Sequence, residues 1–433
     1  MDFPVRGIIR GWWEIGDYEF NLSIPQQVFA GPEITFATPA EIRSYPWAGK
    51  ITDSLPPDVL MTVDPDIQKV QAEARALVRE TALERVQVAR LSARSASDFI
   101  RFNRVEGLSI GAGSTERIGS RVFLTNRARF GFDDHQLKGS AELHVGNLGV
   151  FVRRDFAEIG DVQERSGAFN SLSAQEFGSD LSDPFDRTSI GVGGSGDLAS
   201  GWHVALSGSR VIDRQLSVHA VPASGAFLPP ALISPLRGLR ASVDLDRAAR
   251  AFLGGEFRVG GGISVLEAGD QTWSRVHVSA DQRYVIGASR VNLSAFTASQ
   301  LGNSAPLQEL VYFGGPISLP GYALHDVAGS NGVAGRAEAV LPVPFIPIPL
   351  GRFGSIPAQA HLVPFVAGAY VHGFPACTAA IGRGPTKTNG FYPAAGMGLL
   401  TFFDLLRLDV ARGLRDGRWM FNIDVSRDFW SIL

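Results

Sequence analysis

Residues 137–145, with the sequence LKGSAELHV, alternate apolar and polar side chains along the chain. Successive residues of a β-strand point to opposite faces. One face therefore carries Leu137, Gly139, Ala141, Leu143 and Val145, and the other carries Lys138, Ser140, Glu142 and His144. A strand with one apolar and one polar face needs an apolar medium on one side only. The stretch predicts a half-buried β-strand.

The same alternation returns toward the C-terminus, in residues 239–246, 406–411 and 419–426. Between Asn103 and Phe429 we find about 14 to 16 such segments of roughly 8 to 13 residues each. Strands of soluble sandwiches average about 5 to 6 residues, whereas membrane-spanning strands need about 9 to 11. We therefore predict an all-β transmembrane protein, an antiparallel up-and-down outer-membrane β-barrel of about 16 strands.

The composition agrees with a membrane protein that spans as strands. The chain has 433 residues, of which 45% are hydrophobic and only 19% are charged. The most apolar run, residues 340–350, holds four prolines and cannot form a spanning helix. The net charge of −3 gives no reason to expect nucleic acid as a partner.

The region before the barrel divides into two predicted parts. Residues 1–64 have short apolar stretches and turn signals, which predict a β-rich periplasmic segment, the end of a truncated domain. Residues 65–98 begin with Pro65 and have high helix propensity, which predicts a helical connector. The barrel then occupies residues 99–433. Because the chain starts without the features of a signal peptide, it is either a mature form or a fragment. The strand-and-turn pattern that already begins at residues 8–28 favours a fragment of a larger protein.

Residues 314–322, with the sequence GGPISLPGY, resemble a known motif. They are similar to the sixth extracellular loop of the outer-membrane protein assembly and secretion superfamily, the bacterial surface antigen family of BamA, TamA and two-partner secretion transporters. The resemblance implies that this loop folds into the barrel lumen. The loop motif residues are Gly314, Gly315, Leu319, Pro320, Gly321 and Tyr322.

Flanking residues extend the resemblance. Glu338 looks like the acidic position of the next family strand, and residues 102–108, FNRVEGL, resemble the first barrel strand of distant members. The resemblance also implies a C-terminal strand signal, carried by Phe421, Ile423, Val425 and Phe429, although the chain runs on past Phe429.

Two departures from the family pattern fall at partnered positions. Pro320 stands where the family has an arginine, and Ala367 stands where the following strand offers that arginine an aspartate. Losing both members of a buried ion pair can be nearly neutral, whereas losing one leaves a buried charge. In place of the ion pair, Pro320 and Gly321 predict a tight turn that sets the loop by backbone geometry.

The sequence offers little catalytic chemistry. Residues 191–196, GVGGSG, match the letters of a dinucleotide fingerprint, but no helix pattern follows, so we expect a turn between strands. The acidic clusters at residues 133–134 and 180–186 could hold a cation, but solvated loops explain them better. No nucleophile elbow or clustered metal-ligand pattern is found in the sequence. We expect no enzyme activity, no cofactor and no metal.

Three functions remain in competition. The first, implied by the resemblance, is insertion or export of polypeptides across the outer membrane of a Gram-negative-type envelope, through a weak seam between the first and last strands. Its implied partners are outer-membrane lipid and a polypeptide substrate or periplasmic chaperone. The second is a passive membrane anchor or pore for a missing N-terminal module. The third is a barrel enzyme with a lumenal site. A disulfide between Leu108 and Ile423 should distinguish the first two.

Overall fold

The computed structural model describes residues 89–91, 95–118, 121–198, 201–302, 305–347, 359–374 and 384–430, together with Ser44. The chain divides into two compact units, residues 1–85 and 86–433. The description below concerns the second unit. The predicted β-rich segment of residues 1–64, and residues 65–88 of the predicted helical connector, lie outside the described residues apart from Ser44.

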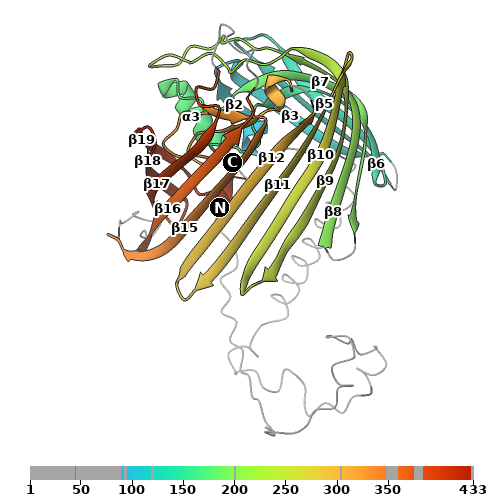
Figure 1. Cartoon of the computed structure of the whole chain (residues 1–433). Coiled ribbons are helices and arrows are strands. Elements are labelled where there is room, and N and C mark those ends of the chain that lie inside the picture. Colours follow the sequence, from blue (N-terminus) through green and yellow to red (C-terminus); the bar gives the residue numbers. More distant parts are fainter. Residues whose placement is uncertain are drawn as a thin grey trace, which may run out of the picture. The chain divides into compact units, whose positions relative to one another are not determined.

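The second unit is built on one large antiparallel sheet that curls into a barrel (Figure 1). Its N-terminal strands are β1 (Ala89–Leu91), β2 (Ile100–Asn103), β3 (Gly107–Arg117), β4 (Val122–Gly131), β5 (Leu137–Val145), β6 (Leu148–Glu158), β7 (Pro184–Leu198), β8 (Trp202–Arg214) and β9 (Leu236–Phe252). The C-terminal strands are β10 (Gly255–Ala268), β11 (Gln271–Ile286), β12 (Ser289–Gly302), β15 (Asn331–Pro344), β16 (Gln359–His372), β17 (Gly390–Thr401), β18 (Leu406–Gly413) and β19 (Trp419–Val425). The fold class predicted from the alternation is confirmed.

The first position of the sheet is an interrupted strand. β1 pairs with one end of β3 and β2 with the other, and the short 3-10 helix η3 (Ala96–Asp98) separates them. The sheet thus has 17 strands in 16 positions. Gly111 of β3 faces the interruption, because a Cβ there would lie 2.3 Å from the carbonyl oxygen of Asp98. The close approach of this backbone requires glycine.

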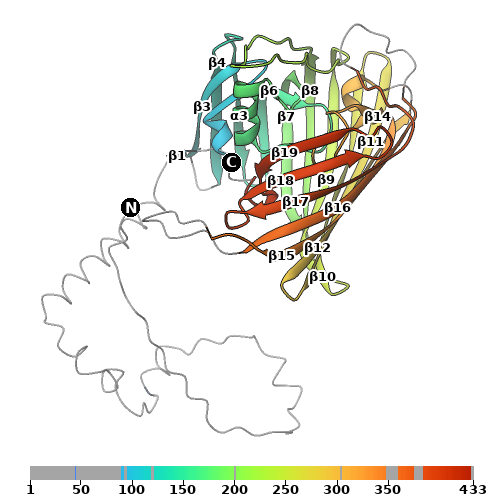
Figure 2. The ribbon, with the colours of Figure 1, turned by 90° about the vertical axis from the view of Figure 1, so that its left-hand side faces the viewer.

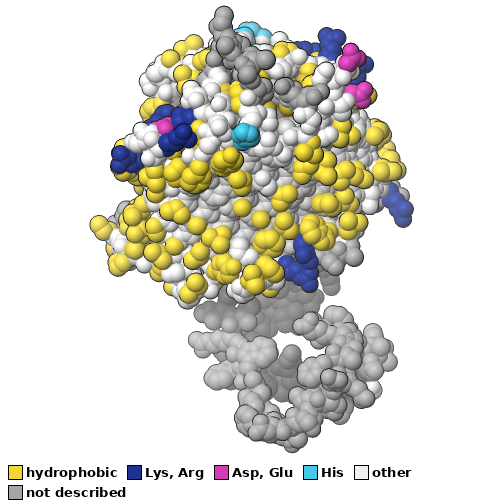
Figure 3. Space-filling view, viewed as in Figure 1, with side chains coloured by type: hydrophobic (Ala, Val, Ile, Leu, Met, Phe, Trp, Pro, Cys, Tyr) yellow, Lys and Arg dark blue, Asp and Glu magenta, His cyan; other side chains and the backbone are white. Residues whose placement is uncertain are grey.

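The two faces of the sheet are inverted relative to a soluble protein. Side chains on the outer face are apolar and exposed; they include Leu148, Val150 and Val152 of β6, Ile190 and Val192 of β7, and Phe421 and Ile423 of β19. Charged residues of the inner face are buried; they include Arg129, Lys138, Asp213, Arg275, Arg336, Arg407 and Asp409. Figure 3 shows hydrophobic side chains over the middle of the barrel wall, with few charges among them. An apolar outside and a polar inside match a barrel that spans lipid.

Several connections at one end of the barrel carry structure of their own. The β6–β7 connection holds the helix α3 (Gly167–Phe177), and the β12–β15 connection holds the 3-10 helix η5 (Leu307–Glu309) and the small hairpin β13 (Val311–Phe313) with β14 (Val327–Gly329). Figure 2 shows α3 beside β19 and the first strands. In the described part of the chain, no helix is both long and apolar enough to cross a membrane.

Three sequence predictions need correction. Residues 89–91, assigned to the helical connector, form β1 and pair with β3. Residues 191–196, predicted as a turn, lie inside β7, where Gly191 lets the backbone of β8 approach: a Cβ would lie 2.3 Å from the oxygen of Gly208. Residues 102–108 form the end of β2, a turn and the start of β3, so Leu108 belongs to the second strand.

The inverted faces predict different effects of the same substitution on the two sides of β7. Val192 is 58% exposed in the middle of the outer face. We expect Val192→Arg to lower the free energy of unfolding from lipid vesicles by about 2 to 4 kcal/mol, because a guanidinium would be placed in hydrocarbon. Ser195→Arg, which faces the lumen three residues later, is the control and should change stability much less. Equal losses for both variants would contradict the assigned membrane face. Urea titration of the folded protein in vesicles measures both.

Candidate functional site: loops folded into the barrel

The β12–β15 connection contains the predicted loop motif. We call its described part, residues 305–330, the inserted loop. Every residue from Val311 to Tyr322 is buried. Gly314 and Gly315 have φ angles of 119° and 120°, a region that favours glycine. A Cβ on Gly314 would lie 2.0 Å from the carbonyl oxygen of Ala323. Gly314 is therefore required by the close packing of the loop on itself.

The tip of the inserted loop is a tight turn. The backbone N–H of Tyr322 donates to the carbonyl oxygen of Leu319 at 3.4 Å, with Pro320 and Gly321 between them. Proline at the first central position and glycine with φ 85° at the second are the features of a type II turn. A Cβ on Gly321 would lie 2.1 Å from the backbone nitrogen of Gly413 at the end of β18. The turn thus presses against the barrel wall.

Ala367, one of the two positions where the resemblance puts an ion pair, lies in an apolar cluster with residues of the loop motif. Leu319, Tyr322 and Ala367 belong to one buried cluster, and Ala367 projects from β16 on the lumen side. The phenol of Tyr322 also donates to the carbonyl oxygen of Pro393 at 2.9 Å. The remaining members of the cluster are Ala298, Val311, Phe313, Val327, Ala334, Ala369, Val371, Tyr392 and Ala394. The structure therefore brings the loop motif and Ala367 together without a charge.

Glu338 is linked to the inserted loop through an arginine that was not predicted as a site residue. Glu338 pairs with Arg407 of β18 at 3.0 Å and with Arg336 at 3.3 Å. Arg336 in turn donates from Nη1 to the carbonyl oxygen of Pro316 at 3.0 Å, and its guanidinium lies over the ring of Phe365. A cation on the wall, rather than in the loop, thus reaches the loop backbone. Its place in the sequence gave no signal beyond its proximity to Glu338.

A carboxylate from another loop holds the inserted loop by its backbone. We call residues 159–183, which connect β6 to β7, the helical loop. Glu164 of this loop is buried and accepts the backbone N–H of Ile317 at 2.7 Å and of Ser318 at 3.2 Å. Gly315 leaves room for it, because a Cβ there would lie 2.6 Å from the Glu164 carboxyl. Burial raises the pKa of Glu164, although the bonds from Ser318 and Ile317 oppose that shift.

A second contact between the same two loops joins an acid to a histidine. Asp183 at the end of the helical loop lies 2.8 Å from Nδ1 of His325, and both side chains are buried. The His325 ring packs edge-on against Tyr312. His325 has a φ of 53°, so its backbone is held in the left-handed region. The contact orients the histidine within the loop interface.

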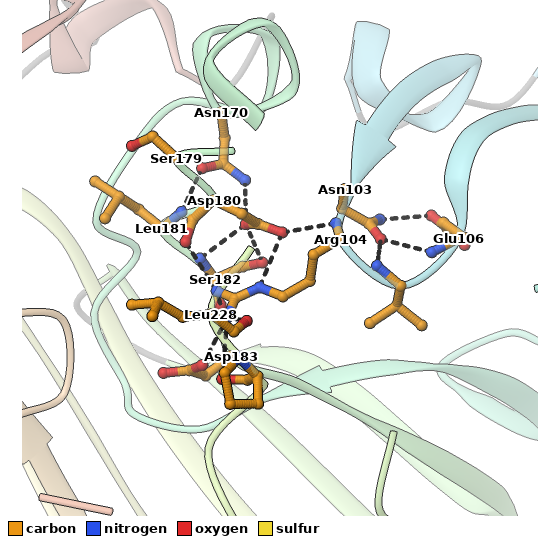
Figure 4. Close-up of polar contacts among 12 residues, drawn as sticks. Asn103, Arg104, Glu106, Asn170, Ser179, Asp180, Leu181, Ser182, Asp183 and Leu228 are labelled. Atoms are coloured by element: carbon orange, nitrogen blue, oxygen red, sulfur yellow. Dashed lines mark hydrogen bonds and ion pairs between the residues drawn. The ribbon is translucent and has the colours of Figure 1, made fainter. Parts of the chain in front are cut away.

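Arg104, in the turn between β2 and β3, ties the first hairpin to two loops (Figure 4). Its Nε donates to the carboxylate of Asp180 at 3.3 Å, and its guanidinium also donates to the carbonyl oxygens of Asp180 and Ser182 in the helical loop. Nη1 reaches the carbonyl oxygen of Leu228 in the β8–β9 connection at 2.9 Å. Arg104 is only 1% exposed, so a fully buried guanidinium is satisfied by its neighbours.

Glu106, in the same turn as Arg104, forms ion pairs with cations on the lumen wall. Glu106 accepts from Arg101, lies 3.2 Å from Arg129 and 3.1 Å from Lys138, and is fully buried. These cations lower the pKa of Glu106 to about 2 against the opposing effect of burial. Asn103 closes the turn, because its side-chain oxygen accepts the N–H groups of residues 105 and 106. The motif at residues 102–108 thus anchors the first hairpin.

The other end of the helical loop reaches the last strand. Ser166, the N-cap residue of α3, donates from its backbone nitrogen to Asp424 of β19 at 2.9 Å and also from its hydroxyl. Arg165 donates to the side-chain oxygen of Asn422 at 3.1 Å. Helix α3 itself packs against β2. The helical loop therefore links the first hairpin, the last strand and the inserted loop.

Two sequence interpretations differ from these positions. Asp180, Asp183 and Asp186 are buried and paired, so the interpretation of residues 180–186 as a solvated loop is wrong. β19 ends at Val425, and Phe429 lies in the 3-10 helix η7 (Arg427–Phe429) rather than in a strand. Phe421 and Ile423 face outward, whereas Val425 is buried. Within the described ranges, no group of three His, Cys, Asp or Glu side chains forms a candidate metal site.

Comparison with known proteins gives likeness of architecture. No family model and no curated protein matches the chain. Among solved structures it is similar to BamA from Haemophilus ducreyi lacking POTRA domains 1–3, with 12% identity and a TM-score of 0.47, over 81% of this chain and 78% of that one. The antiparallel sheet of this chain, with its apolar outer face and polar inner face, has the fold of an outer-membrane-type β-barrel. CdiB from Escherichia coli matches with 14% identity and a TM-score of 0.41, over 76% of this chain and 59% of that chain. CdiB from Acinetobacter baumannii matches with 13% identity and a TM-score of 0.37, over 75% and 58%. The chain spans less than two thirds of either CdiB chain.

Removing the buried guanidinium of Arg104 should loosen the first hairpin and the helical loop together. We expect Arg104→Gln to lower the free energy of unfolding by about 3 to 5 kcal/mol, because Asp180 would keep a buried charge without its partner. Arg153→Gln is the control: its ion pair with Glu142 is half exposed and should contribute less than about 1 kcal/mol. Denaturant unfolding compares them. A loss for Arg104→Gln no larger than the control's would contradict the central place of this residue.

Glu164 should make stability depend on pH in a known direction. Its folded pKa lies above the ordinary value of 4.5, so the unfolded chain releases this proton first as the pH rises. The stability that the neutral carboxyl contributes is complete below the unfolded pKa and is lost as the pH rises toward the folded pKa. Glu164→Gln stays neutral and keeps an acceptor oxygen. The difference in unfolding free energy between Glu164→Gln and the natural protein should therefore grow in favour of the variant from acid to neutral pH. A pH-independent difference would contradict this.

Proposed function

We propose that the protein lies in the outer membrane of a Gram-negative-type envelope and acts in the insertion or export of polypeptides. The observation that carries this proposal is the helical loop, which joins the first hairpin through Asp180 and the last strand through Asp424, and braces the inserted loop through Glu164. A barrel that opens between its end strands needs such a connection to be reversible. Side-chain bonds between loops can break and re-form without unfolding the wall.

The first strand supports the same proposal. β1 has 3 residues and β2 has 4, with a 3-10 helix between them, and β19 has 7. Strands β9 and β11, in the middle of the sheet, have 17 and 16. Short strands offer few ladder hydrogen bonds, so the region where the two ends of the sheet meet is weaker than the rest of the wall.

The partners proposed for this function are outer-membrane lipid and a polypeptide substrate or a periplasmic chaperone. A noncatalytic role accords with a lumen whose buried acids are paired with arginines, lysine or histidine, or bonded to backbone N–H groups. A passive pore is less favoured, because the inserted loop and the helical loop both pack inside the wall and would obstruct the passage of solutes.

A disulfide between the helical loop and the last strand tests the proposal. Leu108 lies on the second strand, so Ser166 and Asp424, whose side chains are in contact, make the better pair. In a Cys377→Ser background, oxidised Ser166→Cys/Asp424→Cys should slow the insertion of an unfolded eight-stranded barrel protein into proteoliposomes by at least about tenfold, if opening is required. Reduction should restore the rate.

The matched control joins two strands that are already paired. Val410 and Phe421 face each other across β18 and β19. Oxidised Val410→Cys/Phe421→Cys should leave insertion unchanged. Insertion at the natural rate with the Ser166–Asp424 tether closed would refute opening at this place and would favour the anchor.

A further inference from the structure

Four arginines face outward at the loop end of β6, β8 and β9. Arg154 is in phase with the exposed Val150 and Val152, Arg210 and Arg214 with the exposed Leu206, and Arg237 with the exposed Leu239. The side chains of Arg154 and Arg214 are 40% and 49% exposed, and Arg210 and Arg237 are also exposed. On each strand, these arginines share a face with the apolar residues of the outer wall. Their guanidiniums therefore point away from the lumen.

Strand register places the four arginines in one patch, which we call the arginine patch. Arg154 lies opposite Thr188, Thr188 opposite Ile212, and Ile212 opposite Arg237, so one row crosses four strands. Arg214 and Arg210 lie two residues to either side of Ile212 on the same strand face. Neighbouring strands are about 4.8 Å apart, so the row spans roughly 15 Å. This is the scale of one or two lipid headgroups.

The patch carries more positive than negative charge. Asp186 lies between two of its members, 3.4 Å from Arg154 and 3.2 Å from Arg214. Glu267 lies opposite Leu239 on the outer face. Against four guanidiniums, these two carboxylates leave an excess of two positive charges. In the part of the chain that the structure describes, Arg210 and Arg237 take part in no ion pair.

The apolar rows directly below fix the depth of the patch in a membrane. The row of Arg210 also contains Val152, Ile190 and Leu239. The next row toward the other end of the barrel contains Val150 and Val192. Outward side chains just beyond an apolar belt meet the headgroups of the leaflet. A guanidinium presents a planar fork of donors that matches the oxygens of a phosphate.

We propose that the arginine patch binds the phosphate of anionic lipid headgroups in the leaflet at the loop end of the barrel. The bound lipid would hold β6 to β9, which lie on the side of the sheet away from its two ends, while the seam strands remain free to move. The site differs from the lumenal loops, and its function does not depend on polypeptide transport.

Native mass spectrometry of the whole protein, titrated with phosphatidic acid and separately with phosphatidylcholine, tests the proposal. The variant Arg210→Gln/Arg237→Gln keeps the pairs of Asp186 and should weaken phosphatidic acid binding by roughly tenfold or more, from about 1 kcal/mol per arginine. Phosphatidylcholine binding should not change. Arg258→Gln, which removes one charge from the lumen side of β10, is the control and should bind phosphatidic acid as the natural protein does.

Two results would overturn the proposal. Phosphatidic acid binding by the double variant at the natural affinity would show that the patch does not hold the headgroup. An equal loss in Arg258→Gln would show that binding follows net charge rather than this surface. Because the substituted arginines have no ion-pair partner among the described residues, unfolding in vesicles should be unchanged in both variants, and this separates binding from folding.

Discussion

The structure depends on one buried carboxylate. A loop that enters a barrel lumen must satisfy its own backbone donors away from water, since each unpaired group would cost free energy. Just before the turn at the tip of the inserted loop, Glu164 accepts the N–H groups of Ile317 and Ser318. The rest of the loop is held by apolar packing of Leu319 and Tyr322 on β16 and by the turn through Pro320 and Gly321. Glu164 therefore supplies the polar partner that packing cannot supply.

Glu164 also explains why the helical loop matters to the whole barrel. The same segment carries Asp183, which orients His325, and Asp180, which receives Arg104 from the first hairpin. Ser166, two residues after Glu164, holds Asp424 of the last strand. One connection of the sheet thus contacts both ends of the wall and the loop inside it. A change in any of these contacts can reach the others through a short, folded segment.

The sequence predicted the wall much better than the interior. The alternation of residues such as those of 137–145 depends only on the pleat of a strand and the lipid outside, so strand positions and faces could be read locally. The loop motif was found for a different reason, because Gly314, Gly315 and Gly321 need backbone conformations that few residues adopt. In the structure, Leu319 and Tyr322 of this motif share a buried apolar cluster with Ala367.

Contacts between residues that lie far apart in the sequence could not be predicted from a local pattern. Glu164 and Ile317 are separated by 153 residues, and Arg104 and Asp180 by 76, and neither pair has a local pattern. Asp180 and Asp183 resemble ordinary loop acids until the fold brings Arg104 and His325 to them. The assignment of residues 102–108 to one strand failed for a similar reason. The turn within them is closed by the side chain of Asn103 and by a glycine with positive φ at residue 107. The usual turn signals, proline or Asn-Gly, are absent there.

The most direct test of the account is amide hydrogen exchange at Ile317 and Ser318 in the protein folded in lipid. The account predicts that both amides exchange slowly in the natural protein and that Glu164→Ala makes them exchange quickly, while amides of β16 stay protected. Fast exchange of Ile317 and Ser318 in the natural protein would contradict it, because the inserted loop would then not be held inside the barrel by the carboxylate of the helical loop.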